Sequence, residues 1–581
     1  MASRRRGGSA MTGWAVRSRW SGAVLASTLL VGLLGGCTAA SKRDGSGDGR
    51  PSGAAVPAYG RTDVNPQPRS RLREGGTLTL PLYRWPAQFN VHHVDGASDE
   101  MSAISGMLEP RLFARDAKGV PHPVPDYLRS AAVTATTPRT VVTYRLHPEA
   151  RWSDGTPLGW RDFAAQWQAL GRGDDRYRIA DPSGYEDIAS VRPGADDHEV
   201  RVTFEEPFAD WQRLFTPLYP AAAFGTPGRF NQGWQDGTPV TAGPFRIGER
   251  DVTARTLTLV PDPAWWGTRP RLDRVVFRTL DPTAAVHAFL NKEIDAVNAA
   301  AADVYERLRD ARDTDIRTGS AWDQIQVVLN GAAGPLRDPE VRRAVLRAID
   351  RQALADVAGE GLPVGVPLLG NHFFMTNQPG YTDHSAGSGY DPEEAARILD
   401  RRGWRRDGAD GVRSKDGRPL RLRFVVSQST NRLGLDLSQL IQQMLRQAGF
   451  DVRIEKVPAD DYGPQYLNRG NFDLVISRYI GLSYPSDLHA FYRPTDGEQI
   501  YANYGRISSP RLDALLREAG RTLDEGRRTR LYSQADALIW ELAHDVLLYQ
   551  RPQVLAVREG LANYGVPGLG DIDFGAVGWE R

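Results

Sequence analysis

The pair His92-His93 is the densest group of side chains in the sequence that could do chemistry. Imidazole nitrogens bind transition metals, but a metal site needs three or four ligands that converge on one point. Adjacent side chains on a strand point to opposite faces, so this pair cannot form such a site alone. We therefore predict no metal site and no cofactor.

The sequence also lacks the short motifs that mark common catalytic sites. It contains no G-x-S-x-G, no H-E-x-x-H and no G-x-x-x-x-G-K-[ST], the patterns of serine hydrolases, zinc proteases and phosphate-binding loops. We predict that the protein is not an enzyme. A surface hydrolase stays open as an alternative, and a cleft with an acid and a base within hydrogen-bond reach of one point would identify it.

Residues 407–420, DGADGVRSKDGRPL, superficially suggest a calcium-binding loop. Such a loop needs oxygen ligands at alternating positions and a closing glutamate. Ala409, Gly411 and Arg413 stand at the wrong places for that pattern. The composition is typical of a turn that leads into the strand beginning at residue 420.

Cys37 is the only cysteine of the chain, and it follows an apolar run near the N-terminus. Arginines come first, and the apolar stretch of about residues 23–34 falls short of the ~20 residues that span a bilayer. This order is the layout of an export signal. Because Leu34-Gly35-Gly36-Cys37 looks like a bacterial lipobox, we predict a signal peptide over residues 1–36 and lipidation of Cys37. The alternative is an ordinary secretory signal.

A lipid on Cys37 would leave no thiol for disulfides, zinc–cysteine sites or a cysteine nucleophile. The 72 basic and 71 acidic residues argue against nucleic acid as a partner, because that needs a strongly basic face. Residues 37–74 are rich in Gly, Ser, Pro, Arg and Asp, which predicts a flexible tether. We expect the protein on the outer face of the cytoplasmic membrane, held by its lipid.

Strand and helix signals intermix from about residue 75 onward. Helical stretches open with Asp-Pro, an N-cap followed by proline at the first helical position, at residues 281–295, 338–350 and 391–404. Residues 433–450 place apolar side chains on one face and end at Gly449. Strand patterns at 420–427 and 450–457 flank this helix, which predicts a β-α-β unit with a parallel strand pair. The predicted fold class is α/β with separate lobes.

Aromatic residues are the most informative class for binding, and the chain contains fourteen tryptophans. We expect most of them to pack in the core. A few could line a cleft, where flat apolar rings with polar edges suit an amphipathic small ligand.

Several motifs, in order along the chain, resemble the extracytoplasmic solute-binding proteins of family 5, which serve oligopeptide, dipeptide and nickel ABC importers. They are VTYRLHPEARWSDGTPLGWRDFAAQW (142–167), TAGPFRIGERD (241–251), LTLVPDPAWWGTRPRLDRVVFRTLDPTAAVHAFLNKEIDAV (257–297), VVLNGAAGPLRDPEVRRAVLRAIDRQAL (327–354), YDPEEAARILDRRGW (390–404) and DGVRSKDGRPLRLRF (410–424). NVHHVDG, FADWQRLFTPLYP and FGAVGWE resemble an actinobacterial lipoprotein branch of the family. One mycobacterial member of that branch is linked to assembly of phosphatidylinositol mannosides and lipoarabinomannan.

The resemblance implies a two-lobed, periplasmic-binding-protein-like fold of class II that closes over a buried ligand. Lobe one would comprise residues 75–325, with an extra subdomain at about 111–236. Lobe two would comprise residues 326–540, and a C-terminal segment, residues 541–581, would return to lobe one.

The stretch SRYIGLSYPSDLHAFYRP, residues 477–494, is the most relevant to a ligand. In peptide-binding members an aspartate at this place pairs with the peptide α-ammonium, and a tyrosine follows it. Here Ser483 stands at the position of that aspartate and Tyr484 matches the tyrosine, while Asp487 could take over the pairing. An ammonium without a carboxylate partner is costly in a low-dielectric cleft, so the ligand stays open. The predicted ligand-binding residues are Trp85, Phe89, Asn90, Thr241, Tyr484 and Asp487.

The resemblance further implies how the protein works. A lipid-anchored monomer would capture a peptide or peptide-like small organic ligand by closing its lobes and would deliver it to ABC permease subunits. A regulator of cell-envelope lipoglycan assembly on the same fold is the alternative, and it would need no permease. Neighbouring permease and ATPase genes would favour transport.

Overall fold

The computed structural model describes residues 62–581, except residues 407, 409–410, 496 and 498–499. The predicted signal peptide, the predicted lipidation of Cys37 and most of the predicted tether lie outside the described residues. None of the described helices is long and apolar enough to cross a lipid bilayer.

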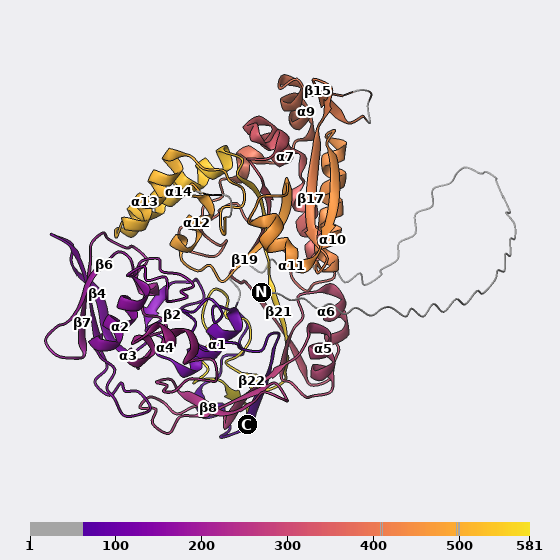
Figure 1. Ribbon diagram of the computed structural model, residues 1–581. Coiled ribbons are helices and arrows are strands. Elements are labelled where there is room, and N and C mark those ends of the chain that lie inside the picture. The colour runs from indigo at the N-terminus through magenta and orange to yellow at the C-terminus, as the bar shows by residue number, and fades with distance from the viewer. Residues whose placement is uncertain (1–61, 407, 409–410, 496, 498–499) are drawn as a thin grey trace, which may run out of the picture. The chain divides into compact units, whose positions relative to one another are not determined.

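The buried apolar side chains form separate clusters, and the two largest define two lobes. One cluster draws mainly on residues 78–277 and the other mainly on residues 325–549. We call lobe one the part that contains the first cluster and lobe two the part that contains the second (Figure 1). The fold is thus two-lobed and mixed in helix and sheet, as the sequence predicted.

Lobe one has a four-stranded sheet in the order β1-β10-β9-β8. Strand β1 pairs parallel with β10, and the other neighbours are antiparallel. Alternate residues of the β1 sequence TLTLPL are buried, which is the period of a strand with one face on a core. The bounds are β1 (Thr77–Leu82), β8 (Phe245–Asp251), β9 (Thr256–Pro261), β10 (Arg274–Thr279) and the adjoining helix α1 (Asp99–Leu108).

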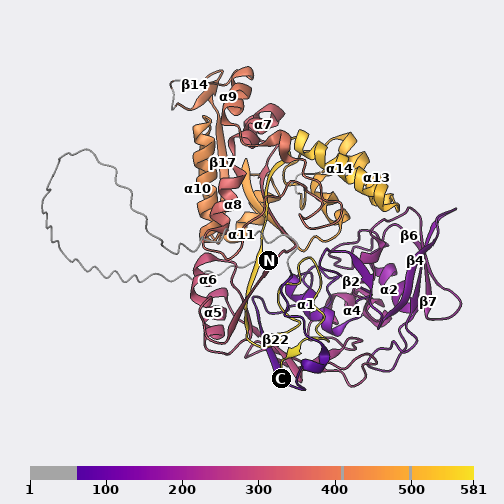
Figure 2. The same ribbon diagram turned by 180° about the vertical axis from the view of Figure 1, so that it is seen from behind.

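A second four-stranded sheet, in the order β4-β5-β7-β6, is entirely antiparallel. It falls within residues 111–236, where the sequence predicted an extra subdomain, and helix α2 packs on it beside α3 and α4 (Figure 2). The bounds are β2 (Phe113–Arg115), β3 (Pro121–Pro123), β4 (Leu128–Ala135), β5 (Thr140–Leu146), α2 (Trp160–Leu170), β6 (Ile188–Pro193), β7 (Glu199–Phe204), α3 (Ala221–Phe224) and α4 (Pro227–Gln232).

Lobe two is built on a five-stranded sheet in the order β18-β17-β19-β13-β20. Strands β17 (Arg421–Ser427) and β18 (Asp451–Val457) pair in parallel and are joined by α10 (Arg432–Gln447), so the predicted β-α-β unit is confirmed. The remaining bounds are β13 (Asp323–Leu329), α7 (Pro339–Ala348), α8 (Arg351–Gly359), α9 (Pro392–Arg401), β14 (Arg405–Arg406), β15 (Arg413–Lys415), β16 (Arg418–Pro419), α11 (Ala459–Asp461), β19 (Leu474–Ile480), α12 (His489–Tyr492), α13 (Pro510–Arg521), α14 (Glu525–Glu541) and β20 (Asp545–Gln550).

The Asp-Pro signals mark helix starts as predicted. Asp281, Asp338 and Asp391 are the N-caps of α5 (Pro282–Leu290), α7 and α9, and each carboxylate accepts backbone N–H groups of the first turn. Proline fits the position after the cap because the N–H that it lacks would have no partner inside the helix.

The chain crosses between the lobes at two neighbouring places. Strands β11, β21 and β12 form a three-stranded sheet of lobe one in that order. The chain passes from β12 of this sheet to β13 at one crossing and from β20 to β21 at the other. The bounds are β11 (Ala296–Asn298), α6 (Ala302–Leu308), β12 (Thr314–Gly319) and β21 (Gln553–Arg558). The side chain of Gln550 donates to the carbonyl of Ala321 across the two crossings (2.9 Å). We propose lobe boundaries at residues 320–322 and 551–552, because all of β20 is buried in the lobe-two sheet.

Residues 62–73 are folded against the C-terminal end of the chain. Asp63 bridges Val566, and Leu72, which is 1% exposed, bridges Glu580, next to the short pair β22 (Leu561–Ala562) and β23 (Gly578–Trp579). The prediction of a flexible tether up to residue 74 differs from this arrangement. The difference has a physical reason: the partners lie about 500 residues away, and local composition does not reveal them.

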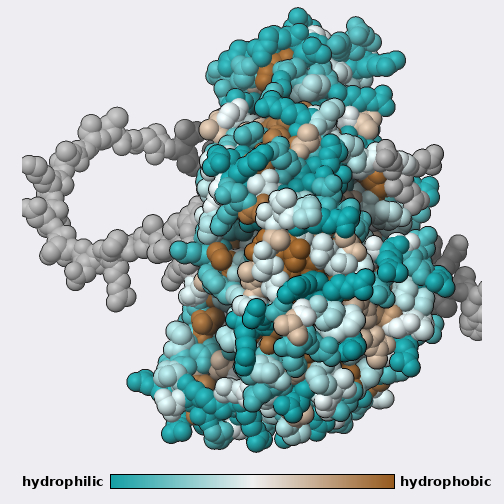
Figure 3. Space-filling model, turned by 90° about the vertical axis from the view of Figure 1, so that its left-hand side faces the viewer, coloured by the Kyte–Doolittle hydropathy of each residue, from teal (hydrophilic) through white to brown (hydrophobic). Residues whose placement is uncertain are grey.

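The surface over one side of the described chain is mostly hydrophilic. Figure 3 shows hydrophobic residues there in small separate groups. Scattered exposed apolar residues are ordinary for a folded protein, so this face gives no sign of a broad apolar contact.

Candidate functional site

A cavity of about 470 Å³ lies between the lobes. Its lining comes from three parts of the chain: residues 91–217 of lobe one, residues 481–487 of lobe two, and Asp571 near the C-terminus. The size falls in the range of about 300–1,000 Å³ that small-molecule sites occupy. A ligand in this cavity would touch both lobes.

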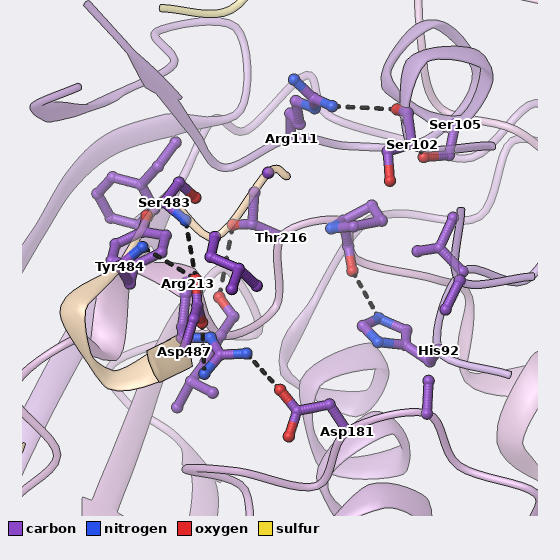
Figure 4. A pocket seen from close by; sticks show the side chains of 18 of the residues that line it. His92, Ser102, Ser105, Arg111, Asp181, Arg213, Thr216, Ser483, Tyr484 and Asp487 are labelled. Atoms are coloured by element: carbon purple, nitrogen blue, oxygen red, sulfur yellow. Dashed lines mark hydrogen bonds and ion pairs between the residues drawn. The ribbon is translucent and has the colours of Figure 1, made fainter. Parts of the chain in front are cut away.

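Arg213 joins the two lobes at one wall of the cavity (Figure 4). It ends the 3-10 turn Trp211–Arg213 of lobe one, and its guanidinium lies 2.5 Å from Asp181 of the same lobe and 3.0 Å from Asp487 of lobe two. Burial disfavours the charged guanidinium, but Asp487 and Asp181 outweigh it and hold the pKa of Arg213 above its ordinary value. The pair therefore acts as an electrostatic contact between the lobes.

Two more arginines share one carboxylate at another part of the lining. Arg115, at the end of β2, donates to both oxygens of Asp571 (2.7 and 3.2 Å), and Arg111 lies 3.1 Å from the same group. Burial raises the pKa of Asp571, but the two arginines outweigh it, so the pKa lies below its ordinary value. These charges satisfy one another within the protein.

The lobe-two wall is the turn that follows β19. The carboxylate of Asp487 accepts the backbone N–H groups of Ser483 (3.0 Å) and Tyr484 (2.9 Å), and the chain continues as the 3-10 turn Pro485–Leu488. Burial raises the pKa of Asp487 in spite of the nearby Arg213. Asp487 therefore shapes this turn and holds Arg213 at the same time.

Helix α1 contributes a row of hydroxyl groups to the cavity. Ser98, Ser102 and Ser105 all line it, because residues spaced by three or four share one helix face. Ser98 is the N-cap, and its side chain accepts the N–H of Met101. Ser102 and Ser105 donate to carbonyls one turn earlier (3.0 and 3.1 Å), so their oxygens keep lone pairs for a ligand.

The structure brings together two of the six predicted ligand-binding residues. Tyr484 and Asp487 line the cavity, and burial raises the pKa of Tyr484 above its ordinary value. Ser483, at the position where the family resemblance implies an aspartate, lines it too. For Tyr484 and Asp487, ligand binding remains our proposal.

The other four predicted residues do not line this cavity. Phe89 and Asn90 are 1% and 0% exposed in lobe one, and Thr241 is buried and donates to Asp262 (3.2 Å). Trp85 packs against the lobe-one core with the Arg250 guanidinium 5.4 Å from its ring. Phe89 and Trp85 pack in or against the core, and Asn90 and Thr241 make hydrogen bonds within lobe one.

Sequence reasoning missed Arg111, Arg115, Arg213 and Asp571. Each pairing joins positions far apart in the chain, as with Arg115 and Asp571, which are 456 residues apart. Arg213 stands inside the quoted motif FADWQRLFTPLYP, but arginine is frequent throughout this chain. No local signal distinguishes these arginines from those on the surface.

The side chains of Ser533, His384 and Asp536 contact one another in the same serine–histidine–aspartate arrangement as a serine-hydrolase triad. Ser533 Oγ lies 2.9 Å from His384 Nε2, and His384 Nδ1 lies 2.6 Å from Asp536. The hydrogen bond to Asp536 raises the pKa of His384. Ser533 does not line the cavity between the lobes. We assign this group to the polar core of lobe two.

Metal ligands do not gather in the described part of the chain. Among its residues, no group of three or more His, Cys, Asp and Glu side chains is placed to hold a metal ion. His92 lines the cavity, and burial lowers its pKa to about 4, so its ring is neutral there.

Comparisons with known proteins agree with this architecture. Residues 122–501 match the family described as "Bacterial extracellular solute-binding proteins, family 5 Middle". The chain is 37% identical over 576 residues to "Oligopeptide-binding protein OppA" of Mycobacterium tuberculosis, covering 98% of this chain and 95% of the relative. It is 29% identical over 345 residues to "Probable monoacyl phosphatidylinositol tetramannoside-binding protein LpqW" of the same species, covering 55% and 52%.

A solved structure shows the same fold. The "Periplasmic EDTA-binding protein EppA" superposes with a TM-score of 0.81 at 26% sequence identity, covering 91% of this chain and all of that one. These relatives and neighbours are binding proteins rather than enzymes.

Proposed function

Because the chain belongs to the bacterial extracellular solute-binding proteins of family 5, we propose that it captures a peptide or peptide-like small organic ligand between its lobes. We further propose that it delivers this ligand to the permease subunits of an ABC importer. The observation that carries the proposal is the cavity of about 470 Å³ lined by both lobes. Binding there would favour the closed state, since only that state offers contacts on both sides.

The backbone of the lobe-two wall supports a peptide as the ligand. Among the described residues, the Leu482 N–H has no hydrogen-bond partner, and the Gly481 and Leu482 carbonyls accept no hydrogen bond. An extended peptide pairs its own N–H and C=O groups with such free main-chain groups. The name of the mycobacterial oligopeptide-binding relative points to the same class of ligand.

Thermal unfolding with a synthetic tri- to pentapeptide mixture tests the proposal. A ligand that binds only the native state stabilises it by about 2.7 kcal/mol at a hundred times its Kd, so the melting temperature should rise. Tyr484→Ala should remove the shift because Tyr484 lines the cavity. Trp85→Ala should keep it because Trp85 does not. No shift of the wild-type protein with any peptide would refute peptide binding.

We propose that Cys37 carries the lipid that holds the protein at the membrane. The support is the lipobox-like sequence before Cys37 and the family's extracellular location. Cys37→Ser should remove incorporation of labelled fatty acid and should release the protein from the membrane fraction. Membrane retention of an unlipidated Cys37→Ser protein would contradict the anchor.

A regulator of lipoglycan assembly is the second candidate, and the similarity to the tetramannoside-binding relative supports it over about half of each chain. The same unfolding assay separates the two candidates. Stabilisation by phosphatidylinositol mannoside headgroups but not by peptides would favour the regulator.

A further inference from the structure

Five arginines gather at the end of lobe one that faces away from lobe two. They are Arg69, Arg71, Arg73, Arg271 and Arg581, and we call them the arginine patch. Arg271 donates to the carbonyl of Arg69 (3.2 Å), and the backbone N–H of Arg581 donates to the carbonyl of Arg71 (3.2 Å). Figures 1 and 2 both place the C-terminus, which is Arg581, at this end.

Most of the charge of the arginine patch is not neutralised within the protein. Arg271 pairs with Glu74, but the other four arginines form no ion pair among the described residues. A second carboxylate beside the patch, Glu580, accepts a hydrogen bond from Asn65 instead (2.6 Å). The patch therefore presents a local excess of positive charge.

The arginines also repel one another. Partial burial lowers the pKa of Arg271, and the positive charges of Arg69 and Arg581 lower it further. An anionic group beside these guanidiniums would relieve the repulsion, because an opposite charge favours the ionised form. Arg71, Arg73 and Arg581 are exposed, and a guanidinium can donate two parallel hydrogen bonds to a phosphate group.

The patch lies where the described part of the chain begins. Residues 38–61 connect it to Cys37, the predicted lipid site, and they contain four basic and two acidic residues. A chain of that length spans about 25–30 Å as a random coil. A lipid on Cys37 would thus hold the arginine patch within reach of the membrane surface.

The charge of the whole protein makes this end distinctive. Residues 1–36 contain five arginines and no acidic residue, so the rest of the chain has 67 basic and 71 acidic residues. An anionic membrane repels a chain with a negative net charge. A local cluster of arginines then decides which end approaches, because the attraction acts only within a Debye length of the surface.

We propose that the arginine patch binds the anionic phospholipid headgroups of the membrane and thereby fixes lobe one against the surface. Lobe two is then the lobe that moves when the protein closes. This contact goes beyond the proposed function, since it does not depend on the ligand. It also complements the proposed anchor, because a lipid together with a basic patch holds a membrane more firmly than a single chain does.

Co-sedimentation with lipid vesicles tests the contact. The protein for this experiment begins at residue 38, so it lacks the predicted lipid site and keeps every residue that the structure describes. Vesicles of phosphatidylcholine alone are compared with vesicles of phosphatidylcholine and phosphatidylglycerol in equal parts. The protein should sediment with the anionic vesicles at low ionic strength and should be released by high salt, which screens surface charges.

Arg71→Gln combined with Arg73→Gln removes two charges of the patch. Each arginine near an anionic surface contributes about five-fold to partitioning, so the double variant should bind roughly twenty-five-fold more weakly. Neither side chain donates a hydrogen bond among the described residues, so the melting temperature should not change. Arg71→Lys combined with Arg73→Lys keeps the charge and should keep the binding.

Arg129→Gln combined with Arg192→Gln is the matched control. These arginines lie on β4 and β6, are exposed, and form no ion pair among the described residues. The control lowers the net charge by the same amount as the patch variant. It should partition to anionic vesicles as the wild type does, because its charges lie outside the patch.

Three results would overturn the membrane contact. They are equal sedimentation of the wild type with neutral and anionic vesicles, equal losses in the patch variant and the control, and a loss in the lysine variant as large as in the glutamine variant. Absence of sedimentation with anionic vesicles would overturn it as well and would point to a protein partner for the patch. None of these results bears on peptide binding, which the thermal-unfolding assay tests separately.

Discussion

His372 lies at the centre of a charged group buried in lobe two. Its ring nitrogens lie 2.6 Å from Asp536 and 3.2 Å from Asp545, and all three side chains are fully buried. Burial disfavours the protonated ring, but the two aspartates outweigh it and raise the pKa of His372 to about 9. The imidazolium is therefore the form that holds this core together.

Stability should depend on pH through this residue. The folded pKa of about 9 exceeds the unfolded value of about 6.5, so the contribution is complete below pH 6.5 and is lost as the pH rises through 9. Urea unfolding should show the free energy of unfolding falling between these values by on the order of 3 kcal/mol.

The His372→Gln variant provides the control for this dependence. It should be less stable than the wild type at pH 6.5 because it removes the imidazolium that lies between two buried carboxylates, Asp536 and Asp545. Its stability should change less between pH 6.5 and 9. An equal change in both proteins would show that other groups cause the dependence.

Helix α5 illustrates how the elements follow from short sequence signals. Its N-cap, Asp281, accepts the N–H groups of Thr283 and Ala284 (2.9 Å each). Replacing such a cap with alanine costs about 0.5–2 kcal/mol. Asp281→Ala should therefore lower the free energy of unfolding by that amount in urea titrations.

Asp310→Ala is a suitable comparison for Asp281→Ala. Asp310 is 87% exposed. Among the residues that the structure describes, it pairs only with the neighbouring Arg309 and caps no helix. Its replacement should change stability by less than about 0.5 kcal/mol, as is usual for surface positions. Equal effects of the two substitutions would argue against the capping role of Asp281.

Short sequence patterns predicted the helices and strands well but predicted the residues of the cavity poorly. The parallel pair β17 and β18 and the helix between them follow from patterns within 40 residues. Asp63 and Leu72 were expected in a tether, and their partners lie at the other end of the chain. The cavity depends on such distant pairings, so Tyr484 was predicted to line it while Arg213 was not.

At the scale of the whole molecule, Arg213 connects the two lobes. Its ion pair with Asp487 crosses from one lobe to the other, and the N–H of Ser486 donates to Asp210 close by (3.1 Å). We infer that these contacts favour a closed arrangement of the lobes. The ligand then has to supply only the remainder of the free energy of closure.

Arg213→Gln should shift the ligand-free protein toward an open state. The substitution leaves Asp487 and Asp181 without a cation, and solvation of these carboxylates is better when the lobes part. Small-angle X-ray scattering should show a larger radius of gyration than for the wild type. Arg528→Gln, which leaves the cavity unchanged but removes a lobe-two contact to Asp210 (3.5 Å), should have a smaller effect.

An unchanged radius of gyration in Arg213→Gln, with a normal melting temperature, would show that closure does not depend on this pair. A lower melting temperature with no change in radius would assign Arg213 to stability alone.

The pairing of residues 62–73 with the last residues of the chain decides where a spectroscopic probe can report on motion. Trp579 donates to the carbonyl of Thr77 at the start of β1 (3.0 Å), so both ends belong to the same rigid part. Fluorophores on residues 62 and 581 would keep a constant separation while the lobes move. To report on movement of the lobes, one dye should be on residue 62 or residue 581 and the other on α13, because α13 belongs to lobe two.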